Sequence, residues 1–249
     1  MGKHGAGTLR ATPGRADPVE RPGQASPSRP GAPVRSGPWL ARGWSLLIPQ
    51  KHPLQAKTRL RVPDSLRRAL VQAMLADTID AARRTPCVVR IYLLVDGLDH
   101  LSDLGPAVRW VSPIDVGGLP ALNQKLAYAE RVLRCGPAPA ADHLAILPGD
   151  LPALRPDELQ EALRRASGCG RSFLADWSDA GTTLLAAEST TWLNPAFGVG
   201  SARAHSRAGA AALSGDGLDS VRADVDTVPG LARARRLGVG RWTRAVVGT

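Results

Sequence analysis

From Trp44 onward, short apolar runs alternate with segments of helical periodicity, and this alternation is the strongest limit on how the chain can fold. Apolar runs at residues 44–48 and 88–95 flank a segment in which Leu66, Leu70 and Met74 recur at helical spacing, which predicts a β-α-β unit. Further strands are expected at 108–111, 143–147, 172–175 and 182–187, and helices at 122–133, 156–166 and 202–213. Because continuous apolar strands are typical of sheets covered on both faces, the pattern predicts an α/β domain around a mostly parallel sheet.

Residues 1–42 have a different composition from the rest of the chain. They are rich in Pro, Gly, Ser and Arg and show no hydrophobic period, which predicts a disordered leader ahead of one domain at residues 43–249. The leader holds seven basic and two acidic residues, so it carries +5 of the formal net charge of +10. The other +5 is ordinary for a domain that handles phosphates, so nucleic acid is not the expected partner, and a nucleic-acid tether is the alternative interpretation of the leader.

Several function classes are disfavoured by composition. No run approaches the roughly 20 apolar residues that a bilayer span needs, so no membrane partner is expected. Cys87, Cys135 and Cys169 form no CxxC pair, which disfavours a disulfide framework or a zinc site and favours a reducing, cytoplasmic location. The five histidines lack metal-ligand spacing and no G-x-S-x-G motif is present, so zinc and serine hydrolase chemistry are also disfavoured.

A basic loop follows the first expected strand. The segment PQKHPLQAKTRL places Lys51, Lys57 and Arg59 after the carboxyl end of that strand, where ligands bind in open α/β sheets. These cations could cradle a triphosphate, although the segment has neither the P-loop nor the dinucleotide fingerprint. Taken alone, the loop is equally well explained as a solvated basic surface.

Carboxylates follow two other segments. Asp150 comes directly after the apolar run at residues 143–147, at the expected tip of a strand, and the alternation in Asp224-Val225-Asp226 points both of its carboxylates to one side. Paired acids repel each other unless a cation lies between them. Together with Asp150 they predict a divalent-metal site, whereas Asp-x-Asp alone is also common on surfaces.

A glycine-rich turn precedes the last expected helix. Gly198 and Gly200 come before Ser201, which is expected at the N-cap of the helix, so free backbone N–H groups and a hydroxyl could face an anion. Thr182 and Thr183 begin an expected strand upstream and could supply a hydroxyl to the same anion. An ordinary Gly-Ser helix cap is the alternative.

In this order, the segments resemble the guanylyltransferase family that makes the GDP-linked phospho-acid precursor of coenzyme F420, the phosphoenolpyruvate or 2-phospho-L-lactate guanylyltransferases. The resemblance covers residues 44–247 and rests on PQKHPLQAKTRL, MLADTIDAA, AILPGDLPAL, FLAD with GTTLLAA, NPAFGVGSARAH, RADVDT and LGVG. The sequence departs from the family pattern at Ala121, at Ala180 and at Asp96, which is a single acid where a pair is expected. The resemblance implies a Rossmann-like nucleotidyltransferase fold of the GT-A-like type, with three layers around a mostly parallel central sheet.

The same resemblance implies roles for residues. Asp150 and Asp226 would bind Mg²⁺, with Asp224 nearby, and would be the catalytic acids. The phospho-acid would contact Thr183, Gly198 and Ser201. The nucleotide phosphates would face Lys51, Lys57 and Arg59.

The implied reaction transfers GMP from GTP to the phosphate of phosphoenolpyruvate or 2-phospho-L-lactate and releases pyrophosphate. A downstream F420-assembling transferase is a candidate partner. Two alternatives stay open at this point. One is another nucleotidyltransferase of this fold, of the molybdenum-cofactor or sugar-phosphate type, and the other is a non-catalytic basic protein that binds nucleic acid.

Overall fold

The computed structural model describes residues 43–50, 57, 60–105, 109–136 and 142–248. The leader predicted at residues 1–42 lies outside the described residues, as do Lys51 and Arg59. The strands are β1 (Trp44–Pro49), β2 (Val88–Val95), β3 (Ser112–Asp115), β4 (His143–Ile146), β5 (Arg171–Ala175), β6 (Thr182–Ala187) and β7 (Ala211–Ala212). The helices are α1 (Asp64–Arg83), the 3-10 helix η2 (Leu98–Leu104), α2 (Leu122–Cys135), α3 (Pro156–Ala166), α4 (Ser201–Arg207), α5 (Asp219–Arg222), α6 (Val228–Leu237) and α7 (Arg241–Val247).

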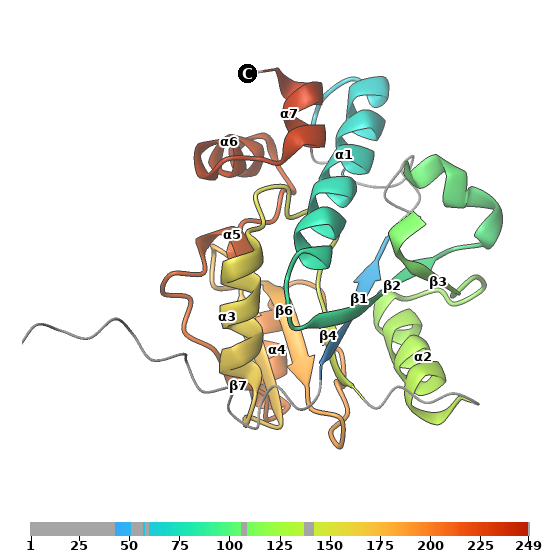
Figure 1. Ribbon diagram of the computed structural model, residues 1–249, viewed down its shortest axis with the longest axis vertical. Helices are drawn as coiled ribbons and strands as arrows, with labels where there is room; N and C mark the ends of the chain where they lie inside the picture. Colours follow the sequence, from blue (N-terminus) through green and yellow to red (C-terminus); the bar gives the residue numbers. More distant parts are fainter. Residues whose placement is uncertain (1–42, 51–56, 58–59, 106–108, 137–141, 249) are drawn as a thin grey trace, which may run out of the picture. The chain divides into compact units, whose positions relative to one another are not determined.

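The strands form one sheet in the order β3-β2-β1-β4-β6-β5-β7 (Figure 1). β1 pairs in parallel with β2 and β4, β2 with β3, and β5 with β7, whereas β6 runs antiparallel to both of its neighbours. The mostly parallel α/β sheet predicted from the sequence is confirmed. Because β1, β2 and β4 are parallel, their carboxyl ends meet at one edge of the sheet, and antiparallel β6 begins at that same edge.

Helices cover both faces of the sheet, which gives three layers (Figure 1). Alternate residues of β1 show how the core is divided, because Leu46 and Ile48 pack with α1 and α3 on one face while Leu47 packs with α2 on the other. All three side chains are fully buried. A third apolar cluster joins α1 to α6 through residues such as Leu70 and Ala234.

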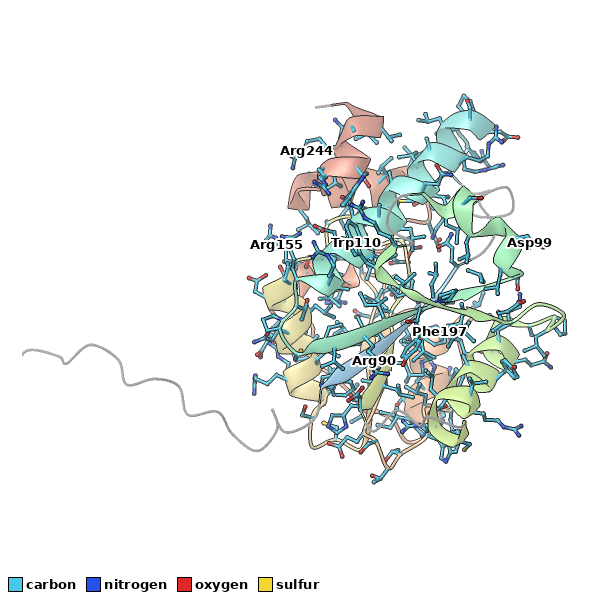
Figure 2. The ribbon with its side chains drawn as sticks, turned by 45° about the vertical axis from the view of Figure 1, so that its right-hand side comes forward. Arg90, Asp99, Trp110, Arg155, Phe197 and Arg244 are labelled. Carbon is cyan, nitrogen blue, oxygen red and sulfur yellow. The ribbon has the colours of Figure 1, made fainter. Side chains whose placement is uncertain are left out.

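Helix α7 packs against α1 and is fastened there by a buried carboxylate. Asp77 of α1 accepts hydrogen bonds from the backbone N–H groups of Trp242 and Thr243, at 3.2 and 2.8 Å, in the first turn of α7. Gly240 allows this close approach, because a Cβ atom there would lie 2.1 Å from Asp77 Oδ1. Figure 2 shows Arg244 of α7 and Arg155, which precedes α3, at the end of the molecule where these C-terminal helices lie.

Three predictions of local structure are wrong. The strand expected at 108–111 is displaced, since Arg109 and Trp110 form a helical turn and β3 begins at Ser112; Val108 lies outside the described residues. The apolar character of Trp110 is explained by packing, because its ring meets Trp242 of α7 with centroids 6.4 Å apart.

The helix expected at residues 202–213 is shorter than predicted. α4 ends at Arg207, Gly209 follows with a φ of +82°, and Ala211 pairs with Ser172 of β5. Alanine favours a helix, but the left-handed glycine ends it and pairing at the sheet edge takes the next residues. Ser201 is not the N-cap, a place that Gly200 takes with a φ of +73°. Among the described residues, no helix is both long and apolar enough to cross a membrane.

Candidate active site

Three carboxylates converge at the carboxyl edge of the sheet, and we call Asp150, Asp224 and Asp226 the carboxylate cluster. One oxygen of each lies within 4.8 Å of the others. Asp150 lies in the loop after β4, and its backbone carbonyl accepts a 3.1 Å hydrogen bond from the N–H of Val225. Val225 is fully buried, so this backbone contact and the buried side chain together hold the two flanking acids beside Asp150.

Lys57 bridges two members of the carboxylate cluster. Its Nζ atom donates to Asp150 Oδ2, and to Asp226 Oδ1 at 2.5 Å. Burial by itself lowers the pKa of this ammonium, but the two carboxylates outweigh it and raise the pKa above its ordinary value. Lys57 is therefore charged at neutral pH. It has a φ of +57°, a conformation that is uncommon for a lysine.

The carboxylate cluster has the donors that a divalent cation needs. Asp150 Oδ1 is buried and has no hydrogen-bond partner within the described part of the chain. Burial and the charges of Asp150 and Asp226 raise the pKa of Asp224 to about 7. Since oxygen ligands from several carboxylates suit Mg²⁺ and similar hard cations, these residues fit such an ion.

Gly149 sets the position of Asp150. A Cβ atom at residue 149 would lie 2.8 Å from Leu75 Cδ1 of α1 and 3.0 Å from Gln50 Oε1 at the end of β1. With any other residue at position 149, Leu75 or Gln50 would have to move, so glycine lets the loop after β4 pack closely against α1. On the other side of Asp150, the Leu151 N–H donates to Thr78 Oγ1 at 3.0 Å.

A cavity of about 570 Å³ opens beside the carboxylate cluster, between α1, α2 and the carboxyl ends of β1, β2 and β4. This volume is in the range of small-molecule sites. Its charged lining has two parts, with Lys57, Asp150 and Asp226 in one and Asp96 and Lys125 in the other. The rest of the lining includes the apolar side chains of Val71, Met74, Leu94, Val116 and Leu122.

Asp96 and Lys125 form an ion pair in the lining. Asp96 follows β2 and Lys125 lies on the first turns of α2. Nearby, the carboxylate of Asp115 accepts hydrogen bonds from the backbone N–H groups of Gly97 and Gly117, at 3.1 and 2.8 Å, which ties the end of β2 to the segment after β3. Sequence reasoning did not identify Lys125. The sequence offers one hint of its importance: Lys125 is one of only four lysines, whereas the other 28 of the 32 basic residues are Arg.

The residues expected to bind the phospho-acid lie together, one strand away from the carboxylate cluster. The Ser201 N–H donates to the Gly198 carbonyl at 3.1 Å, and the Ala202 N–H donates to the Ala180 carbonyl at 3.1 Å, two residues before β6 begins. Ile146 of β4 pairs with Leu185 of β6, so the start of β6, where Thr183 lies, is next to the carboxyl end of β4 that leads to Asp150. None of Thr183, Gly198 and Ser201 is among the described residues that line the cavity.

Thr183 is a buried hydroxyl at a bulge. Ala175 of β5 pairs with Thr182 and Leu174 pairs with Leu184, so Thr183 is the extra residue of β6. Its side chain is 1% exposed, and Oγ1 has no hydrogen-bond partner in the described part of the chain. A buried hydroxyl without a partner is costly, so this oxygen is available to a ligand or a bound water molecule.

Comparison with known proteins identifies the family. The chain is 41% identical to the phosphoenolpyruvate guanylyltransferase of Thermomonospora curvata over 82% of this chain and 88% of that protein. The chain belongs to the phosphoenolpyruvate guanylyltransferase family. The proteins of that name from Streptomyces coelicolor and Geodermatophilus obscurus are 40% and 39% identical, over 82% and 83% of this chain and 95% of each relative. A scan against protein-family models gives no match.

Solved structures agree on the fold of this member of the phosphoenolpyruvate guanylyltransferase family. A 4-diphosphocytidyl-2C-methyl-D-erythritol synthase aligns with a TM-score of 0.55 at 13% identity, over 79% of this chain and 98% of that one. The enzyme of the same name from Anaerococcus prevotii gives 0.54 at 11%, over 81% and 99%. The nucleotidyltransferase fold predicted from the sequence is confirmed.

Proposed function

We propose that this protein transfers GMP from GTP to the phosphate of phosphoenolpyruvate, releasing pyrophosphate and forming the GDP-linked precursor of coenzyme F420. The observation that carries the proposal is the carboxylate cluster at the rim of a nucleotide-sized cavity, in a chain 41% identical to a named phosphoenolpyruvate guanylyltransferase. 2-Phospho-L-lactate is the alternative acceptor, since it also carries a phosphate close to a carboxylate.

Mg²⁺ is the metal that we propose for Asp150 and Asp226, with Asp224 nearby. When bound, the ion would neutralise charge on the triphosphate and on the attacking phosphate oxygen. The carboxylates of this chain would hold it, and Lys57, which they bind in this structure, would then be available to the nucleotide phosphates. Lys57 keeps its charge in both arrangements because its neighbours are anionic in both.

The reaction needs no general base. A phosphate monoester has a second pKa of roughly 6, so the acceptor is already mostly dianionic at neutral pH. Its oxygen attacks the α-phosphorus of GTP, a new P–O bond forms, and pyrophosphate leaves with the electron pair of the broken bond. The contribution of the protein is to position the two anions and to balance their charge.

We place the guanine base beside Asp96 and Lys125. Guanine presents N–H donors next to an O6 acceptor, and a carboxylate beside an ammonium offers the complementary pattern. Adenine lacks the O6 acceptor and presents an amino group there, so the pair favours GTP. The phospho-acid would lie on the other side of the carboxylate cluster, at Thr183, Gly198 and Ser201.

The test is pyrophosphate release by the purified protein with Mg²⁺ and GTP, with phosphoenolpyruvate, 2-phospho-L-lactate and 3-phosphoglycerate offered in parallel. ATP and CTP are the nucleotide controls. We expect release that requires both GTP and phosphoenolpyruvate. Release with another acid would correct the acceptor, and release with another nucleotide would correct the base assignment. A folded protein that binds Mg²⁺ but releases no pyrophosphate with any acid contradicts the proposal.

A further inference from the structure

His205 lies at the centre of the region where the phospho-acid is proposed to bind. It belongs to α4, it is 1% exposed, and its ring packs edge-on against the partly buried Phe197, labelled in Figure 2, with centroids 5.1 Å apart. Both ring nitrogens have partners. Nε2 lies 3.0 Å from the backbone N of Ala196, and Nδ1 lies 3.0 Å from Thr182 Oγ1.

These two contacts fix the position of the proton on the ring. A backbone N–H can only donate, so Nε2 must be the acceptor and carries no proton. Burial and the nearby charge of Arg171 lower the pKa of His205 to about 4, so the ring is neutral at neutral pH. The single ring proton is therefore on Nδ1, which donates it to Thr182 Oγ1.

A hydroxyl that accepts a hydrogen bond from histidine must aim its own proton elsewhere. Thr182 is the first residue of β6 and is partly exposed, next to the unpartnered hydroxyl of Thr183. We call Thr182 and Thr183 the hydroxyl pair. Backbone contacts join this strand start to the turn that contains Gly198 and Ser201, because the Ala202 N–H donates to the Ala180 carbonyl. With the proton of Nδ1 on one side, the hydroxyl of Thr182 can direct its own proton to a ligand bound at this place.

We propose that Thr182 donates a hydrogen bond to the phospho-acid substrate, and that His205 is the positioning residue that holds this hydroxyl as a donor. The inference rests on the proposed function, and it adds a substrate contact to Thr183, Gly198 and Ser201. The phosphate and carboxylate of the substrate have acceptors only, so they need donors. A threonine that could rotate freely would spend part of its time donating to protein carbonyls, whereas one that accepts from His205 is preorganised for an anion.

The competing explanation is that His205 only fills space. Its ring lies between Phe197 and Phe173, with centroids 5.1 and 6.0 Å away, so an aromatic core residue could serve the same packing. In that case the effect of removing His205 would not depend on whether Thr182 has a hydroxyl. A double-mutant cycle separates these explanations.

The experiment compares T182V, H205F and the double variant T182V/H205F with the parent, by steady-state kinetics with Mg²⁺. T182V removes the hydroxyl with little change of shape, and H205F keeps an aromatic ring without nitrogen. We expect T182V to raise KM for the phospho-acid about 10- to 100-fold, because the lost hydrogen bond is to a charged group, while KM for GTP stays within about twofold. H205F should raise the same KM by a similar or smaller factor, and the double variant should be no worse than T182V.

Two conservative variants serve as controls. T182S keeps the hydroxyl and should stay close to the parent, and H205N offers an amide N–H in place of Nδ1–H and should recover part of the loss caused by H205F. Thermal unfolding of each variant checks the fold. If H205F does not fold, T182V and T182S alone still decide whether Thr182 contacts the substrate.

An unchanged KM for the phospho-acid in T182V overturns the inference. The inference is also overturned if the KM increase in T182V/H205F equals the product of the increases in the two single variants. His205 would then act independently of the hydroxyl of Thr182. These failures differ from failure of the proposed function, in which the parent protein releases no pyrophosphate with any phospho-acid and both proposals fall.

Discussion

The carboxylate cluster and the hydroxyl pair lie at the same edge of the sheet but are held in different ways. Asp150, Asp224 and Asp226 repel one another, and the side chain of Asp226 is 53% exposed; the single charge of Lys57 offsets only part of theirs. The hydroxyl pair is neutral, and a buried histidine orients one of its members. From this difference we expect the first region to exchange partners when a ligand binds, and the second to keep its hydrogen bonds unchanged.

Asp150→Asn should have the largest effect on turnover, because it removes a negative charge from the carboxylate cluster. This is the place where we expect a metal ion to replace Lys57. A metal ligand supplies several kcal/mol of transition-state stabilisation, so turnover should fall by about 10³-fold or more. The measurement is pyrophosphate release across a Mg²⁺ titration. T182V is the matched control, and its Mg²⁺ dependence should equal that of the parent. Normal turnover in D150N would exclude the carboxylate cluster as the metal site.

Gly149→Ala tests whether the position of Asp150 depends on close backbone packing. The new Cβ would lie 2.8 Å from Leu75 Cδ1, and overpacking of this kind costs about 1–3 kcal/mol of unfolding free energy. Chemical denaturation measures the loss, and Mg²⁺-dependent activity should fall with it. Gly230→Ala is the control, since its nearest contact of 3.4 Å is an ordinary one and the residue lies in α6. Equal stability of the two variants would contradict the packing argument.

Asp96→Asn should have a smaller effect, on the choice of nucleotide. Loss of a charged acceptor for guanine N–H groups should reduce the ratio of kcat/KM for GTP over ATP by about tenfold. Asp99→Asn, an exposed acid of η2 that Figure 2 labels, is the control and should leave the ratio unchanged. If D96N lowers activity with GTP and ATP equally, Asp96 does not read the base.

Asp224→Asn should have the smallest effect, seen in the pH dependence of stability. Burial raises the pKa of Asp224 from 3.8 to about 7, so the native state binds a proton that the unfolded state has released. The unfolding free energy of metal-free protein should therefore fall as pH rises from about 4 to about 7. D224N should show a shallower fall over this window in urea denaturation with EDTA. If the unfolding free energy of D224N falls with pH as steeply as that of the parent, the pKa of Asp224 is not raised.

The sequence predicted the sheet because its signal is local. Runs of mostly apolar residues mark β1, β2, β4 and β6, and burial on both faces of the sheet explains why these strands contain few polar residues. β3 was misplaced because Trp110 is apolar for a reason outside the sheet, its contact with α7. β7 was predicted as helix because it lies in a run of alanines, which favour helices. In the structure these residues pair with β5 instead.

The candidate site was predictable where a local pattern marks it. Asp150 and Thr183 lie at the end or the start of a strand, and Asp226 belongs to a repeated carboxylate pattern. Lys125 and His205 could not be found in this way, since each lies on a helix and contributes through a partner more than 20 residues away in the chain, Asp96 and Thr182 respectively. Their roles as substrate-site residues stay predictions, as do those of the strand-end residues.

The contact of Asp77 with α7 affects how the cavity beside the carboxylate cluster is assembled. Val71 and Met74 of α1 line the cavity, and one turn further on, Asp77 receives its hydrogen bonds from residues 165 and 166 positions away in the chain. Until that distant segment docks, α1 has a carboxylate facing its apolar neighbours without donors. This wall of the cavity is therefore completed by a contact between residues far apart in the chain, so we expect the cavity to form late in folding. We also expect a fragment that ends before Trp242 to lose the proposed GTP binding.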